Sequence, residues 1–291
     1  MSGPPILELP ASVTLALWLP VVRDRDSAYR AARAVARAGE HHEVHARGAT
    51  AHGPGLHDPG DAAGRRGGIG VSSTAALHRL LAELSPVDEV GAVLPRAGDP
   101  MGAPAARSAD LLDAGEGLLL RRTNGAGAEV CGVVVPMRSA YGSPVEPGEL
   151  VTWLVEEDIT DLVPAPSLLL AGIDSLSQAR REIQLALTEA VEALEDLDVA
   201  RDRPDLAEHL LDLSLATIPD RLLPPGLEPR RVDVLERAAR LLAIVDLALD
   251  DDGGAVTAAQ VDRRSAALAH VGRAARHALC AASATRAAGP S

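Results

Sequence analysis

The chain has 291 residues, of which 47% are hydrophobic, and a formal net charge of −13, a combination typical of a globular protein with a sizeable core. It contains no Lys and no Phe, and only two Trp and two Tyr. An acidic chain with so few rings lacks the basic surface and stacking platforms of a nucleic-acid binder, and without Lys it has neither a P-loop lysine nor a Schiff-base lysine.

The first part of the chain predicts elements of an α/β domain. Residues 13–19 form an apolar, β-capable run closed by Pro20, and they predict a first strand. Residues 27–38 carry a helical stripe of Ala and Val, and residues 43–46 predict a short second strand. Residues 50–70 are rich in Gly, Pro, His and Asp, and we expect a mobile or disordered loop there.

Helix and strand patterns alternate over the next stretch, which predicts a mixed sheet of five or six strands. The dipeptide Asn124-Gly125 is the strongest hairpin signal in the chain. Gly115 is placed to end a short helix. The predicted elements are helices over residues 73–84 and 108–114 and strands over residues 90–94, 118–122, 130–135 and 151–155.

Pro164-Ala-Pro166 marks the expected boundary between an α/β domain over residues 1–166 and an all-α helical bundle over residues 167–288. Beyond it, the residues that begin and end the predicted elements are typical of helices. Ser175-Leu-Ser-Gln178 is a capping box that predicts the start of a long helix. We expect strands only in the first domain and an antiparallel arrangement of helices in the second. The other predicted helices begin near Asp202, near Pro229 and at Thr257, and the last of them ends near Ala282.

Several short segments together resemble an uncharacterised family of actinobacterial proteins, most strongly from about residue 90 onward. The resemblance implies a cytosolic setting, and it carries no activity. The segments are Gly98-Asp-Pro-Met-Gly102, Asp113-Ala-Gly-Glu116, Leu223-Pro-Pro-Gly-Leu227, Leu241-Leu-Ala-Ile-Val245 and Asp251-Asp-Gly-Gly-Ala255.

Five histidines lie between residues 41 and 57, and imidazole is a good zinc ligand. Their spacing matches no metal motif, and neighbours along a strand point to opposite faces. We therefore expect a polar segment, no metal and no cofactor. The alternative is a metal site built from His41, His45, His52 and His57.

Two predicted loops follow strands, over residues 95–102 and 136–144, and ligands of open α/β sheets collect beyond such strand ends. Arginine offers a planar donor fork to an anionic ligand. The simpler interpretation is that Arg96 and Arg138 pair with Asp99 and brace two turns. The candidate ligand-binding residues are Arg96, Asp99, Arg138, Tyr141 and Ser143.

Two functional hypotheses follow. The first is a non-catalytic cytoplasmic interaction or scaffold protein whose helical half binds a protein partner or a second copy of the chain. The second is an α/β enzyme or small-molecule binder with an anionic ligand at the two loops. A carboxylate with a strongly raised pKa beside Arg96 or Arg138 would favour the second, and an exposed apolar patch on the helices would favour the first. We expect no membrane partner, because the apolar run of residues 11–22 is too short to span a bilayer. We expect no nucleic-acid partner, because the chain is acidic and has few aromatic rings. Two scattered cysteines are typical of a reducing compartment such as the cytoplasm.

Overall fold

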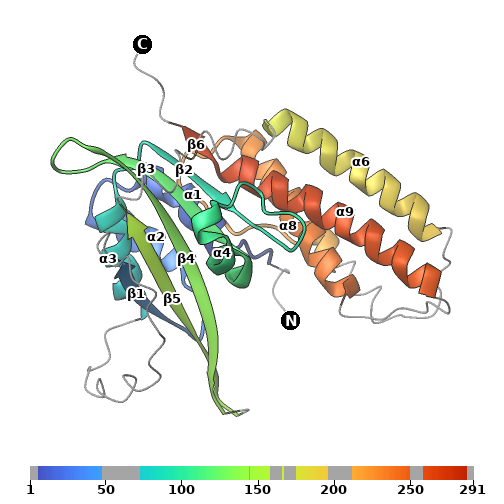
Figure 1. Cartoon of the computed structure of the whole chain (residues 1–291), viewed down its shortest axis with the longest axis horizontal. Helices are drawn as coiled ribbons and strands as arrows, with labels where there is room; N and C mark the ends of the chain where they lie inside the picture. Colours follow the sequence, from blue (N-terminus) through green and yellow to red (C-terminus); the bar gives the residue numbers. More distant parts are fainter. Residues whose placement is uncertain are drawn as a thin grey trace.

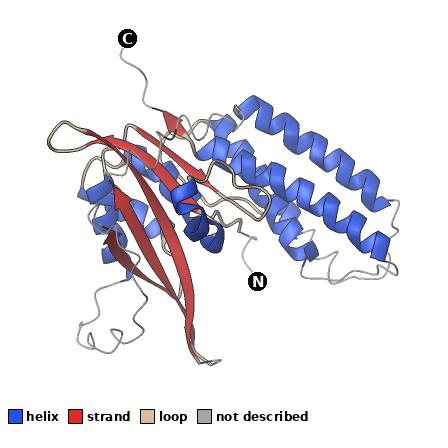
Figure 2. Cartoon of the chain, in the orientation of Figure 1, coloured by secondary structure: helices blue, strands red, loops and turns tan. Residues whose placement is uncertain are grey.

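A mixed six-stranded sheet and a group of long helices make up the computed structural model (Figures 1 and 2). The structure describes residues 6–47, 73–143, 145–157, 166, 175–195, 212–249 and 258–286. The predicted loop over residues 50–70, which includes His52 and His57, lies outside these ranges. The start of the helix expected at Asp202 and residues 164–165 of the predicted domain boundary also lie outside them.

The strands follow the order β1-β5-β4-β3-β2-β6 across the sheet, and only β1 and β5 run parallel. The predicted mixed sheet is therefore confirmed, with antiparallel pairing in the majority. The predicted hairpin at Asn124-Gly125 is also confirmed, because it joins β3 to β4. The strands are β1 (Glu40–Arg47), β2 (Glu89–Val93), β3 (Gly117–Thr123), β4 (Glu129–Gly142), β5 (Pro147–Glu157) and β6 (Thr285–Arg286).

The predicted first strand over residues 13–19 is wrong, because this segment lies in the helix α1 (Ala11–Trp18). All eight residues of α1 are buried, so no polar face gives the segment a helical period. A short apolar run of this kind reads equally well as a buried strand or as a buried helix. The 3-10 helix η1 (Leu19–Val21) follows, with Pro20 inside it.

Helices cover both faces of the sheet (Figure 1). On one face lie α1, α2 (Arg25–Val35) and α3 (Ser73–Leu84), which pack against strand residues such as Leu118 and Leu120. The opposite face carries α4 (Ser108–Ala114), preceded by the 3-10 helix η3 (Ala105–Arg107), and it packs against the alternate residue Leu119. Gly115 ends α4 in a left-handed conformation with φ 69°, as predicted.

Three long helices pack on one another in the C-terminal region: α6 (Leu176–Glu195), α8 (Pro229–Leu249) and α9 (Ala258–Ser283). The Ser175 hydroxyl accepts a hydrogen bond from the Gln178 amide at 3.4 Å, as the predicted capping box requires. The 3-10 helix η5 (Asp220–Leu222) precedes α8. No helix in the described ranges is both long enough and apolar enough to cross a membrane.

The expectation that strands stop before the C-terminal region is wrong. Directly after α9, β6 pairs antiparallel with β2 through Thr285 and Val90, and it borders the sheet (Figure 2). One hydrophobic cluster also joins the two regions, running from Leu7 and α1 to Leu279 in α9. A strand of two residues is too short to give a sequence pattern. Contacts between residues about 270 positions apart, such as those within this cluster, also leave no local pattern in the sequence.

Candidate functional site

The predicted ligand loop over residues 136–144 is wrong, because β4 continues through Gly142 and pairs with β5 along this stretch. Pro136 suggested a break in the strand. It lies beyond the last residue of β4 that pairs with β3, so at this point the strand pairs on one side only, where proline is tolerated. The turn comes later, with reciprocal backbone hydrogen bonds of 3.2 and 3.1 Å between Ser143 and Glu146.

Tyr141 and Ser143 lie at this distal end of the β4–β5 hairpin. The Tyr141 hydroxyl contacts Nδ1 of His41, and the two rings meet edge to face with centroids 5.5 Å apart. The Ser143 hydroxyl accepts hydrogen bonds from the backbone amides that follow it in the turn. Both side chains therefore serve the hairpin, and the structure does not bring them to Arg96.

Arg96 and Asp99 share a tight turn after β2, with reciprocal backbone hydrogen bonds of 3.0 and 2.9 Å, but their side chains part. Arg96 donates from Nη1 to the carbonyls of Pro95 (3.0 Å) and Gly115 (2.7 Å). Asp99 turns to α9 and accepts from Arg276 at 2.9 Å. The interpretation in which Arg96 and Arg138 pair with Asp99 is therefore wrong, since α9 supplies the partner.

The Asp99 carboxylate stays ionised in this setting. Burial raises its pKa, but hydrogen bonds from Arg276 and His277, at 2.9 and 3.3 Å, outweigh burial and lower the pKa below its usual value. Asp99 thus fastens the turn after β2 to the C-terminal helices.

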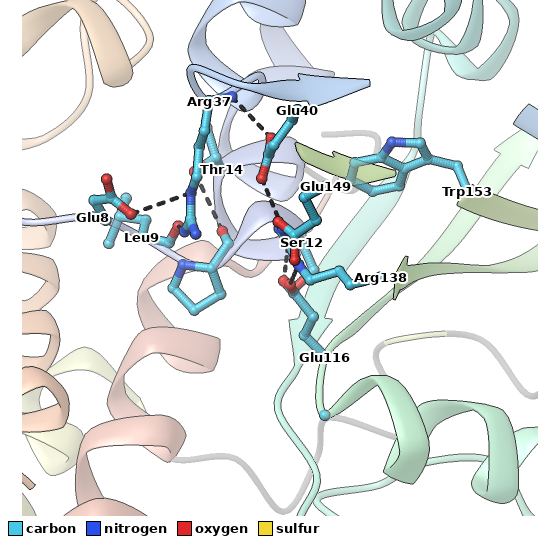
Figure 3. Close-up of polar contacts among 12 residues, drawn as sticks. Glu8, Leu9, Ser12, Thr14, Arg37, Glu40, Glu116, Arg138, Glu149 and Trp153 are labelled. Carbon is cyan, nitrogen blue, oxygen red and sulfur yellow. Dashed lines mark hydrogen bonds and ion pairs between the residues drawn. The ribbon is translucent and has the colours of Figure 1, made fainter. Parts of the chain in front are cut away.

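Arg138 lies at the centre of a partly buried ionic network beneath the start of α1 (Figure 3). Its Nη1 is 2.7 Å from Glu40 and 2.6 Å from Glu149, and its Nε is 3.6 Å from Glu116. Glu116 in turn accepts from the amide and hydroxyl of Ser12 at 2.8 and 2.9 Å. The network ties β1, β4 and β5 to α1.

Burial raises the pKa of Glu40, yet contacts with His42 and Arg138 and the Arg37 amide outweigh it and lower the pKa to about 2. The Glu40 side chain is only 3% exposed, so it is a buried anion held by its donors.

The tautomer of His42 follows from its neighbours. Trp153 can only donate, and its Nε1 points at Nδ1 of His42 at 3.2 Å, so Nδ1 must be an acceptor. The ring proton then lies on Nε2, which is 3.4 Å from the Glu40 carboxylate, too long for a well-formed hydrogen bond. His42 therefore lies beside Glu40 in the core without a well-formed hydrogen bond to it.

The other histidines of β1 are separated from His42 by the alternation of the strand. His41 and His45 are exposed, while His42 is buried. Among the described residues no group of three His, Cys, Asp or Glu side chains is arranged to hold a metal ion. His52 and His57 lie outside those residues, so the alternative metal site remains a prediction without a test.

A cavity of about 410 Å³ opens where the sheet meets the C-terminal helices. Three guanidinium groups line it, and Arg276 has a buried Nε with no hydrogen-bond partner in the described part of the chain. We call this space the inter-region cavity. Its lining residues are Ile6, Leu7, Glu8, Pro10, Arg37, Leu94, Arg96, Ala114, Gly115, Glu116, Leu213, Ala239, Leu242, Ala243, Asp246 and Arg276.

Two family models match the chain, one for each region. The model described as Rv1486c-like protein, N-terminal domain, matches residues 12–166, which is more than half of the chain, and the model described as Rv1486c-like protein, C-terminal domain, matches residues 177–280. The chain belongs to the Rv1486c-like family. No curated protein and no solved structure shows significant similarity to it. The family match supplies no activity, so function has to be argued from the site.

In this member of the Rv1486c-like family, one of the five predicted ligand residues lines the inter-region cavity, and two others contact residues of its lining. Arg96 lines it, Asp99 holds Arg276 at its wall, and Arg138 lies behind Glu116. Sequence reasoning missed Arg37, Glu116 and Arg276 as site residues, because their elements meet only in the folded chain. A weak signal for Glu116 existed, since it ends the segment Asp113-Ala-Gly-Glu116 that carried the family resemblance.

Proposed function

We propose that this protein binds a small monocarboxylate with an apolar tail in the inter-region cavity. The observation that carries the proposal is the presence of two guanidinium groups, Arg96 and Arg276, at the wall of a cavity large enough for a metabolite. Their remaining N–H groups would bind the carboxylate.

The charges around the cavity disfavour a ligand with two negative charges. Its three arginines are matched by Glu8, Glu116 and Asp246, so the lining is neutral in sum. Glu116 is already engaged with Ser12, while a guanidinium carries five N–H groups, so Arg96 and Arg276 keep donors beyond their present bonds. Apolar side chains from Leu94, which follows β2, and from α4 and α8 line much of the remaining space, which suits an aliphatic tail.

Binding is favoured over catalysis because of the state of the carboxylates. The two acids beside the candidate arginines, Glu40 and Asp99, have lowered pKa values and remain ionised acceptors. A general acid at neutral pH needs a raised pKa instead.

The proposal is tested by titrating octanoate into the protein in a calorimeter, with octanol and inorganic phosphate as comparators. Arg276→Lys keeps a positive charge beside Asp99 but removes the planar guanidinium fork, so octanoate affinity should fall at least tenfold. Arg273→Lys is the matched control, since Arg273 lies one turn earlier on α9, is 58% exposed and also approaches Asp99, at 4.0 Å, but does not line the cavity. Octanoate binding that is equal in both variants, or equal for octanol, contradicts the proposal.

We propose as a second function the interaction or scaffold role suggested by the sequence. It is supported by apolar side chains that the C-terminal region leaves exposed, namely Leu185, Leu215, Leu249 and Val261. Single exposed apolar residues are common on any protein surface, so this support is weaker than that for the cavity.

A further inference from the structure

A second and larger cavity, of about 690 Å³, lies between α2 and the segment that leads into α8. We call it the arginine cleft. Arg30 and Arg33 come from one face of α2, three residues apart, and Arg221 comes from η5 across the cleft. The remaining lining is Trp18, Asp220, Leu223, Pro224, Pro225, Gly226, Leu227 and Val232.

The charge at this cleft runs against that of the whole chain. Three arginines and a single carboxylate, that of Asp220, line the cleft, so the lining has an excess of two positive charges in a protein of net charge −13. Arg30 also acts on Asp24, whose pKa is lowered mainly by its hydrogen bonds with Ser27. Asp24 caps α2 from outside the cleft lining, and it offsets part of the charge of Arg30.

The apolar wall of the cleft is fixed before any ligand arrives. Trp18 donates from Nε1 to the Leu222 carbonyl at 2.9 Å, which pins η5 to α1. The wall then turns through two prolines and Gly226, whose φ of 77° favours glycine. A wall of this kind loses little conformational entropy on binding, so contacts with an apolar ligand body are retained as affinity.

We propose that the arginine cleft binds a phosphate monoester dianion that carries an apolar body. The excess of two positive charges in the lining matches a dianion, and a guanidinium fork can bind two phosphate oxygens at once. The segment Leu223-Pro-Pro-Gly-Leu227 provides the surface for the apolar body. This site is separate from the inter-region cavity, with which it shares no lining residue.

The test is calorimetric titration of the full chain with phenyl phosphate at pH 7.5, where its second proton is largely lost. Inorganic phosphate lacks the apolar body and benzoate lacks the second charge, so each should bind at least tenfold more weakly. Arg33→Gln and Arg221→Gln should each weaken phenyl phosphate at least tenfold. Both side chains are exposed, so these variants should fold normally.

Arg25→Gln is the matched control, because Arg25 is an exposed arginine on α2 that does not line the cleft. The affinity of this variant for phenyl phosphate should stay within twofold of that of the parent protein. Arg276→Lys should also leave phenyl phosphate binding unchanged, which separates this site from the carboxylate site. Affinity that survives both glutamine variants, falls equally in Arg25→Gln, or is matched by inorganic phosphate overturns the proposal.

Discussion

Glu40 is a buried carboxylate whose pKa is strongly lowered by its partners. It is buried at the start of β1 and is held by Arg138, His42 and the amide of Arg37. Removing one member of such a group leaves a buried charge without its counterpart, which costs more than the intact pair contributes.

Stability should therefore depend on pH through Glu40. Its pKa is lowered from 4.5 to about 2 in the folded chain, so it stabilises the protein above pH 4.5, and the stabilisation is lost as the pH falls toward 2. The shift corresponds to roughly 3 kcal/mol of unfolding free energy at neutral pH. Urea unfolding of Glu40→Gln between pH 7 and pH 3 should show a lower stability at pH 7 and a flatter pH dependence.

The control for this prediction is Glu43→Gln, since Glu43 lies on the same strand but is 58% exposed. Its stability should stay within about 0.5 kcal/mol of the parent protein. A Glu40→Gln variant with the parent's slope against pH would show that the acid sensitivity arises elsewhere.

Among the elements, α1 shows best what the sequence could and could not predict. The elements whose signals are local were predicted within a few residues: the β3–β4 hairpin, α3 and the start of α8 at Pro229. The helix α1 was not predicted, because it has no polar face. Its N-terminal cap was not predicted either. Pro10 offers no side-chain oxygen at the N-cap, and the acceptor comes from Glu116, 104 residues away.

The same reasoning applies to the candidate site. Arg96 was predicted because it directly follows a strand, and strand ends are local features. Arg276 could not be predicted, since only the packing of α9 beside β2 brings it to the cavity. Tyr141 and Ser143 were misplaced because Pro136 looked like the end of a strand that continues to Gly142.

The remote cap predicts a measurable cost. Glu116→Gln should lower the unfolding free energy by about 1–3 kcal/mol, and Ser12→Ala by about 1 kcal/mol, because a buried charge-assisted hydrogen bond is lost at the start of α1. The two effects should be less than additive in the double variant, as expected for side chains in contact. Asp113→Asn, on the exposed side of α4, is the control, and additive losses in urea unfolding would contradict the assignment.

At the scale of the whole molecule, the two regions share one hydrophobic core. Leu7 bonds to Thr217 through its backbone at 2.9 Å, Asp99 binds Arg276, and α9 packs on both α1 and β2. The family models match the regions separately, but the cluster that holds α1 in place draws side chains from both.

We therefore expect the full chain to unfold in a single cooperative transition, and a fragment of residues 1–166 to lack a native-like fold because α1 loses the cover of α9. Circular dichroism melting of both proteins, together with amide proton spectra of the fragment, checks this. Two separate melting transitions, or a well-dispersed spectrum from the fragment, would support the predicted division into independent domains at residue 166.

The burial of α1 against α9 also sets the order of events during synthesis. At 5–20 residues per second, the roughly 240 residues between Trp18 and Ala258 take about 12–48 s to emerge from the ribosome. Throughout that interval an apolar helix segment has part of its final cover missing, and the strands that pack on it, β2 and β3, emerge only partway through. The nascent chain is therefore a natural client for chaperones that bind exposed apolar segments, and slow translation ahead of α9 lengthens its time at risk of aggregation.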